Sequence, residues 1–205
     1  FNQYFTSIAE ETIKSSGITR KPLTQPMFDR NVPQLVLTET NWVEMNNTIR
    51  SLKTKNSAGY DDISSKLLKW CENELCNPLV DIVNKSFRTG VFPSALKITK
   101  VYPKLKKGPT TEAANYRPIS LTPTFSKIIE KIVLTRLFDH LNTFQLLTPN
   151  QHGFLTGKST ATALINLVEF LLDQTEEGNT ATAILLDYSK AFDCLEHEHL
   201  LTKLT

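Results

Sequence analysis

The sequence contains few cysteines and no long apolar run, and both absences narrow the class of protein. Cys71, Cys76 and Cys194 are an odd number of thiols without the paired spacing of a metal site, which favours a reduced intracellular setting over a disulfide scaffold. No apolar stretch approaches the roughly 18 residues needed to cross a bilayer, and no signal-peptide pattern stands at the start. We therefore expect no membrane association.

The net charge of the chain is also small, at +2, and does not by itself indicate a nucleic-acid-binding protein. Its distribution is more informative, because the stretch from Lys97 to Lys107 carries several lysines and no acidic residue. Such a cluster is typical of a solvated loop as well as of a surface that meets an anion.

The first 37 residues have the composition of a connector. The chain opens at Phe1 rather than at a methionine, which indicates a fragment or a partial gene model. A short helix is expected over residues 4–13, and regular structure is then interrupted at Gly17, Pro22, Pro26 and Pro33. The total length of 205 residues and the hydrophobic content of 40% suit about one globular domain.

Apolar spacing predicts helices over much of the remaining chain. Residues 42–52 place apolar side chains on one face, with Thr38 and Glu39 as start signals and residues 56–59 as the end. A second helix is expected over residues 64–75. A third is expected to start with Pro78 in its first turn and to stop at Gly90, with Leu79, Ile82 and Val83 buried.

The second half of the chain mixes helix and strand patterns. Strand candidates at 98–102 and 116–121 are expected to close an antiparallel hairpin. Helices are expected over 124–141 and 160–172, after which Gly178 and Asn179 turn the chain into a third strand over 182–186. This order of elements predicts an α+β fold.

A carboxylate directly follows the last of these strands. Residues 183–193 read AILLDYSKAFD, so Asp187 stands at the mouth of the expected sheet, where Mg²⁺ takes carboxylate oxygens and keeps several waters. Phe192 comes five positions later, with Asp193 beside it. The alternative is a buried strand that ends in a helix cap, with Asp187 or Asp193 as the cap and Phe192 in the core.

Cations occur on both strands of the expected hairpin. Residues 100–107 read KVYPKLKK and residues 115–121 read NYRPISL. Phosphate is bound by a planar guanidinium fork or a mobile ammonium, and a hairpin brings both to one place. Arg117 precedes Pro118, which biases the arginine towards an extended conformation. Each single lysine is explained equally well by a solvated hairpin tip.

Residues 151–160 read QHGFLTGKST and at first suggest a phosphate-binding loop. Only three residues separate the two glycines, where that motif has four, and no apolar strand leads into the loop, so we reject this interpretation. Lys158 and Ser159 instead begin a helix, where exposed N–H groups favour an anion. A contact with an anionic backbone and a plain helix cap both remain open.

Two other stretches are interpreted mainly as structural. In residues 55–63, which read KNSAGYDDI, Gly59 and Asp61 are expected to shape the turn before the next helix, while Lys55 is free to reach a phosphate. Cys194 with the histidines at 197 and 199 supplies too few ligands for a zinc site and predicts a helix start with surface histidines.

Four of these strings, at residues 55–63, 100–121, 151–160 and 183–193, resemble in their order and spacing the reverse transcriptases of non-LTR retrotransposons of the LINE and jockey type. The resemblance extends over residues 53–204. The resemblance implies a right-hand polymerase, with a connector over 1–37, fingers over 38–180 and the start of the palm over 181–205. The opening residues FNQYF also resemble the connector after an endonuclease domain, which implies such a domain upstream. The family's further metal carboxylates and its thumb would follow Thr205, so we expect a truncated chain.

The resemblance also implies roles for individual residues. Asp187 would be catalytic, as one ligand of a pair of Mg²⁺ ions. Phe192 would lie under the sugar of the incoming nucleotide and exclude a 2′ hydroxyl, and Ala191 would let the backbone approach the triphosphate. Arg117 and Lys104 would bind the phosphates of that nucleotide. Contacts with the template are implied for Lys55, Lys158 and Ser159.

The implied function is RNA-directed DNA polymerisation by two-metal nucleotidyl transfer onto a primer 3′ end. Its partners would be an RNA template, a DNA primer and deoxynucleoside triphosphates, and nuclear action is implied by the resemblance alone. Because Asp187 is one ligand out of a larger expected set, we predict that these 205 residues do not polymerise alone. The alternative is a non-enzymatic RNA-binding remnant, which would bind RNA with strong salt dependence and little sequence preference.

Overall fold

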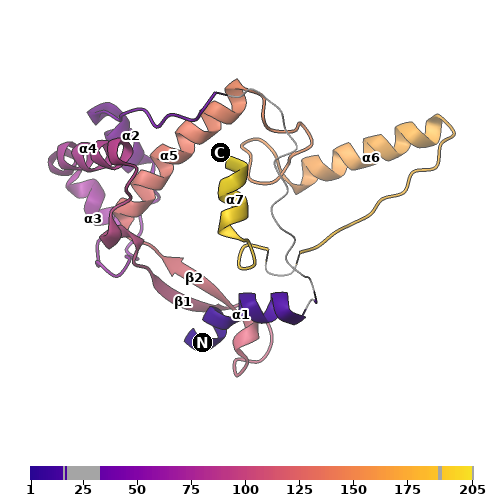
Figure 1. Cartoon of the computed structure of the whole chain (residues 1–205), viewed down its shortest axis with the longest axis horizontal. Coiled ribbons are helices and arrows are strands. Elements are labelled where there is room, and N and C mark those ends of the chain that lie inside the picture. Colours follow the sequence, from indigo (N-terminus) through magenta and orange to yellow (C-terminus); the bar gives the residue numbers. More distant parts are fainter. Residues whose placement is uncertain (16, 18–32, 189–190, 205) are drawn as a thin grey trace. The chain divides into compact units, whose positions relative to one another are not determined.

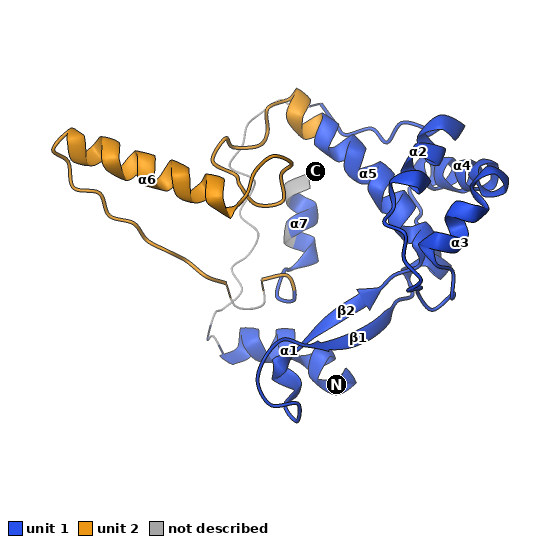
Figure 2. Ribbon diagram, turned by 180° about the vertical axis from the view of Figure 1, so that it is seen from behind, with its two compact units in different colours: residues 1–139, 193–205 blue, residues 140–192 orange. Residues whose placement is uncertain are grey.

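The computed structural model describes residues 1–15, 17, 33–188 and 191–204. Pro22 and Pro26, which we expected to interrupt the connector, lie outside these residues. The chain divides into two compact units, one made of residues 1–139 and 193–205 and the other of residues 140–192 (Figure 2). The expected functional boundaries at 37/38 and 180/181 remain predictions.

The described residues form a mixed, mainly helical structure with a small two-stranded sheet (Figure 1). In the first unit the helices are α1 (Asn2–Ser15), α2 (Trp42–Ser51), α3 (Ser65–Trp70), α4 (Glu72–Thr89), α5 (Thr124–Thr143) and α7 (His197–Leu204). The last turn of α5 extends into the second unit, which also contains α6 (Thr160–Glu176). The sheet pairs β1 (Lys100–Leu105) with β2 (Tyr116–Leu121), and two 3-10 turns lie at Ser94–Lys97 and Ala113–Asn115. No helix in the described ranges has both the length and the apolar content needed to cross a membrane.

The expected helices are present, with three differences in the first half of the chain. The side chain of Asn41 accepts a hydrogen bond from the N–H of Glu44, so α2 is capped at Asn41 rather than at Thr38, and it ends earlier than expected. The helix expected over 64–75 breaks at Cys71, where α3 gives way to α4. Pro78 consequently lies inside α4 and not in its first turn.

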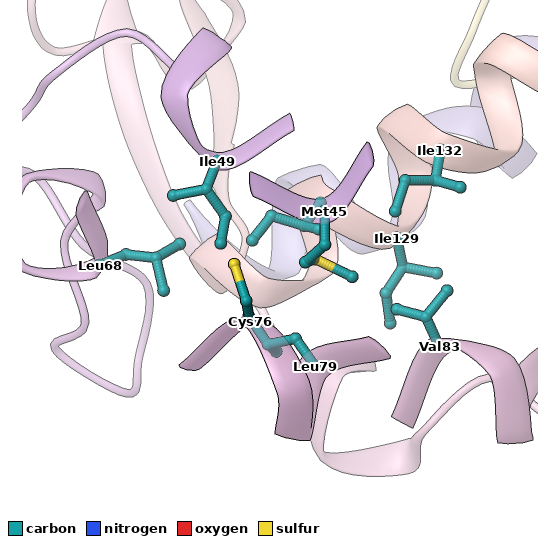
Figure 3. Packing of buried hydrophobic residues seen from close by; sticks show 9 residues of the cluster. Met45, Ile49, Leu68, Cys76, Leu79, Val83, Ile129 and Ile132 are labelled. Carbon is teal, nitrogen blue, oxygen red and sulfur yellow. The ribbon is translucent and has the colours of Figure 1, made fainter. Parts of the chain in front are cut away.

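A single apolar core joins α2, α3, α4 and α5 (Figure 3). Its buried members come from all four helices: Met45, Ile49, Leu68, Cys76, Leu79, Val83, Ile128, Ile129 and Ile132. Leu79 and Val83 are buried as predicted, but Ile82 is 45% exposed, so that prediction was wrong for one residue of the three. Burial on this face stabilises α4 despite the backbone hydrogen bond that Pro78 cannot donate.

Polar contacts at Thr40 hold the segment before α2 against this core. The N–H of Thr40 donates to Oδ1 of Asn84 at 2.8 Å, and Nδ2 of Asn84 donates to the carbonyl of Thr40 at 2.9 Å. The Thr40 hydroxyl donates to Glu44, which forms a two-pronged ion pair with Arg136 on α5. That hydrogen-bonded guanidinium holds the pKa of Glu44 below its ordinary value of 4.5.

The third expected strand is absent, and the prediction for residues 182–186 was wrong. Residues 179–188 have no regular secondary structure, and Ile184, Leu185 and Leu186 are 80%, 88% and 75% exposed. A strand is held by hydrogen bonds to a neighbouring strand. In the described part of the chain the sheet contains β1 and β2 alone, so the apolar pattern of 182–186 has no ladder to join.

Candidate functional site

The hairpin of β1 and β2 places cations from both strands on one face. Lys104 is the direct cross-strand partner of Arg117, while Tyr102 faces Ile119 and Lys100 faces Leu121. Because opposite residues share a face and alternate residues return to it, Lys100, Lys104 and Arg117 all project from the same side. All three are exposed. The other face carries no charged residue of either strand and includes the opposed pair Pro103 and Pro118.

The pairing of Lys104 with Arg117 is electrostatically unfavourable unless an anion lies nearby. Like charges directly opposite one another weaken an antiparallel pair. None of the ion pairs found among the described residues involves Lys100, Lys104 or Arg117. The arrangement is therefore suited to a phosphate, for which arginine offers a planar fork and lysine a mobile ammonium.

Side-chain hydrogen bonds shape the tip of the hairpin. Gly108 has a positive φ of 89°, and a Cβ there would lie 2.7 Å from Nδ2 of Asn115. Nδ2 of Asn115 donates to the carbonyl of Pro109 at 2.9 Å, and the Tyr116 hydroxyl donates to the carbonyl of Thr110 at 3.0 Å. These hydrogen bonds order the turn at the tip, and an ordered turn fixes the strand register in which Lys104 lies opposite Arg117.

Residues 55–63 contact the segment that joins β2 of the hairpin to α5. Asp61 accepts a hydrogen bond from the N–H of Ile63, and the hydroxyl of Thr124 donates to the carbonyl of Ile63 at 2.6 Å. The hydroxyl of Ser65 accepts from the N–H of Lys55, whose side chain is exposed. The geometry agrees with the mainly structural interpretation of this string and leaves the Lys55 ammonium in solvent.

The second unit carries Asp187 and Phe192. Asp187 is exposed and lies in the segment without regular structure, and residues 189 and 190 of the same motif lie outside the described ranges. Phe192 is 78% exposed, which contradicts its alternative placement in a core. Asp193 does not cap a helix either, because α7 begins only at His197.

Phe154 is a contact of this motif that the sequence interpretation missed. Its ring stands perpendicular to that of Phe192, with centroids 6.0 Å apart, an edge-to-face arrangement. Both rings are largely exposed. The available signal was an aromatic residue inside the string QHGFLTGKST, but sequence spacing does not reveal a contact across 38 positions. Ala191 is exposed beside Phe192.

The loop before α6 is organised by the helix start. Ser159 is the N-cap, its side chain accepts from the N–H of Thr162, and the hydroxyl of Thr162 accepts from the N–H of Ser159. His152 contacts the same hydroxyl through Nδ1 at 2.9 Å. These bonds support the helix-cap alternative for Ser159, while Lys158 is exposed. The template contact of both residues remains a proposal.

The structure thus brings Lys104 and Arg117 together, and separately Phe192 and Phe154. In the described ranges no three or more His, Cys, Asp and Glu side chains gather where they could hold a metal ion. Asp187 offers carboxylate oxygens, the ligand type that Mg²⁺ prefers, but these residues do not complete a site around it. The expectation of a helix start with surface histidines rather than a zinc site near Cys194 remains a prediction, because the side chain of His199 lies outside the described residues.

Comparison of the sequence with known proteins identifies relatives of this chain. Residues 104–205 match the model of the family described as reverse transcriptase (RNA-dependent DNA polymerase). The chain is 30% identical over 161 residues to the probable RNA-directed DNA polymerase from transposon BS of Drosophila melanogaster, which covers 78% of this chain and 18% of that protein. It is 31% identical over 170 residues to the RNA-directed DNA polymerase from mobile element jockey of the same species, covering 82% and 19%.

The chain belongs to the reverse transcriptase family. Within that family its relatives are the enzymes of non-LTR retrotransposons, which include jockey, BS and the X-element. It spans less than a fifth of the length of the jockey and BS proteins and is a fragment relative to them. The match confirms the resemblance that the four sequence strings indicated.

Proposed function

We propose that this chain is the part of an RNA-directed DNA polymerase of a non-LTR retrotransposon that binds the incoming deoxynucleoside triphosphate. The observation that carries the proposal is the direct pairing of Lys104 with Arg117 on an exposed hairpin face that also bears Lys100. In this proposal residues 38–180 act as the fingers and residues 181–205 as the start of the palm.

The chemistry of the hairpin face suits a triphosphate better than a carboxylate ligand. A triphosphate presents several anionic oxygens in a row, and cations on two adjacent strands meet more than one of them. Arg117 binds two oxygens through its fork, while the ammonium groups of Lys104 and Lys100 neutralise the remaining charge. Binding of the anion also relieves the repulsion between the paired cations.

Asp187, in the second unit, has a separate role in the proposal. Its carboxylate would be one ligand of Mg²⁺, which when bound activates the attacking 3′ hydroxyl and stabilises charge on the phosphates. Phe192 would exclude a 2′ hydroxyl by collision with its ring, and Ala191 would admit the triphosphate. A single carboxylate does not hold two metal ions, so we expect no primer extension by the 205-residue chain itself. Robust extension that Asp187→Asn abolishes would contradict this expectation.

The triphosphate site is tested by titrating the chain with a deoxynucleoside triphosphate and Mg²⁺. Phosphorus NMR monitors the phosphate resonances during the titration, because this method detects weak binding. Arg117→Ala removes a charge-assisted contact and should weaken binding about tenfold or more. Arg88→Ala is the matched control, because Arg88 is an exposed arginine on α4 that pairs with Glu39. Equal binding by the Arg117→Ala variant and the unchanged chain would overturn the assignment.

The same titration separates the proposal from the RNA-binding remnant. A remnant would bind RNA through its lysines without preferring a triphosphate, and its RNA affinity would fall steeply with salt. The polymerase interpretation requires that Arg117→Ala impairs triphosphate binding much more than bulk RNA binding.

A further inference from the structure

The helix α3 ends in an exposed tryptophan that carries a lysine over its ring. Trp70 is 72% exposed, against 43% for Trp42, the other tryptophan of the chain. Lys66, one turn earlier, places its Nζ 5.0 Å from the centre of the Trp70 ring. A large aromatic side chain left in solvent costs free energy, so an exposed ring with a cation at its face is a candidate contact surface.

Two further lysines lie close to Lys66 and Trp70 along the backbone. Lys69 precedes Trp70 and places its Nζ 3.3 Å from the hydroxyl of Thr54. Lys55 lies beside Lys66, because the N–H of Lys66 donates to the carbonyl of Lys55 at 3.3 Å. The side chains of Lys55 and Lys66 are exposed, and that of Lys69 is half-buried. We call Lys55, Lys66, Lys69 and Trp70 the α3 patch.

No acid of α3 offsets these charges. The helix reads SKLLKW and contains no acidic residue. Glu72, two positions beyond Trp70, is bound by Arg50, whose Nε and Nη2 lie 3.0 and 2.5 Å from the same carboxylate oxygen. That ion pair engages the acid nearest to Trp70 along the chain, and Lys66 at the face of the ring has no acid within its own helix.

We propose that the α3 patch binds single-stranded nucleic acid, with one base stacked on Trp70 and the neighbouring phosphates held by Lys55, Lys66 and Lys69. Single strands are bound by this combination of an aromatic platform and backbone-tracking cations, with little preference for base sequence. An acidic protein would use the charges but would not need the ring. The choice of nucleic acid as ligand rests on the proposed function, whereas the residues are distinct from the triphosphate-binding cations of the hairpin.

The chain offers a direct test, because it has only two tryptophans. Trp42→Phe leaves Trp70 as the only tryptophan, and Trp70→Phe leaves Trp42, so that excitation at a wavelength that tyrosine does not absorb reports on one ring at a time. Both variants of the 205-residue chain are titrated with a twelve-residue oligouridylate and with oligothymidylate, without nucleotide or metal. Stacking should quench the fluorescence of Trp70 and leave that of Trp42 unchanged. The RNA and DNA strands distinguish the two sources of the same chemistry.

Affinity variants measure what the ring and the lysines contribute. Trp70→Ala should weaken binding about tenfold, since one stacked base is lost. Lys66→Gln and Lys69→Gln should each reduce the slope of log affinity against log salt by about 0.7. Lys85→Gln is the matched control, because Lys85 is an exposed lysine on α4. Lys66, Trp70 and Lys85 are exposed and Lys69 is half-buried, and none of the four belongs to the apolar core, so the variants are expected to fold.

The outcomes separate this inference from the proposed function. Absent quenching of Trp70 together with unchanged affinity of Trp70→Ala overturns the patch, even if Arg117 still governs triphosphate binding. If the fluorescence of Trp70 is quenched but Arg117→Ala does not change triphosphate binding, the patch is retained and the nucleotide site is overturned. Equal quenching by heparin, which has no bases, or tighter binding of polyglutamate would also overturn the patch.

Discussion

Gly59 lies against the backbone of Pro123 so closely that no side chain fits between them. A Cβ on Gly59 would stand 2.9 Å from the nitrogen of Pro123 and 3.0 Å from its Cα. This approach joins the string KNSAGYDDI to the residues that connect β2 with α5. The glycine is required by proximity to another segment, because its φ is not positive.

Gly59→Ala is expected to destabilise the fold by about 1–3 kcal/mol, because the atoms it meets belong to backbone and cannot rotate away. The free energy of unfolding, measured by urea titration with circular dichroism, checks this. Gly153→Ala is the control, since its Cβ would meet nothing closer than Nε2 of Gln151 at 3.8 Å. Similar losses for the two variants would contradict the argument.

The ion pair of Glu44 with Arg136 makes stability depend on pH in the acid range. The pKa of Glu44 is lowered in the folded protein, chiefly by its hydrogen bonds to Arg136. A carboxyl group with a depressed folded pKa stabilises the protein above its unfolded pKa, and that contribution is lost as the pH falls through the folded value. We therefore expect stability to decline as the pH falls below about 4.5, the ordinary value for this group.

Glu44→Gln should lower the free energy of unfolding at neutral pH by about 1–3 kcal/mol and should flatten the acid decline. Urea titrations at a series of pH values measure both effects. Glu39→Gln is the control, because the Glu39–Arg88 pair is exposed on both sides and contributes little. An acid decline of unchanged steepness in Glu44→Gln would show that other carboxylates cause it.

Residues 182–186 are expected to make the isolated chain self-associate. They are apolar or β-prone, contain no proline or charge, and include the very exposed Leu185. Leu185→Lys should lower the fraction of oligomer in sedimentation velocity runs without changing the free energy of unfolding. Val36→Lys adds the same charge at an exposed apolar position elsewhere and should have less effect. A sharp monomeric melt of the unchanged chain would argue against this prediction.

Local sequence patterns predicted the elements whose hydrogen bonds form within a short stretch of the chain. The span of β2 matches the prediction residue for residue, and α5 and α6 begin where their cap and spacing signals indicated. The strand expected over 182–186 failed because its stability depends on a neighbour that the local pattern does not contain. The break at Cys71 was missed because the apolar spacing continues through it, whereas the backbone of Cys71, at φ −104° and ψ 23°, leaves the helical conformation.

The candidate site divides in the same way. The pairing of Lys104 with Arg117 follows from two strands and a turn that are close in sequence, so a hairpin prediction nearly contains it. The contact of Phe154 with Phe192 and the exposure of Trp70 depend on how separate segments pack. Those features carry no periodic signal that a single sequence could reveal.

The opposed prolines of the hairpin have a consequence for assembly. The N–H of Lys106 donates inward to the carbonyl of Asn115, and the alternation of an antiparallel ladder then directs the backbone nitrogens of Pro103 and Pro118 outward. Neither nitrogen carries a hydrogen, so each outer edge of the hairpin lacks a hydrogen-bond donor near its middle, where another strand would need one to pair. The hairpin is thereby guarded against sheet extension on its left and right flanks alike, and its cationic face stays open to small ligands.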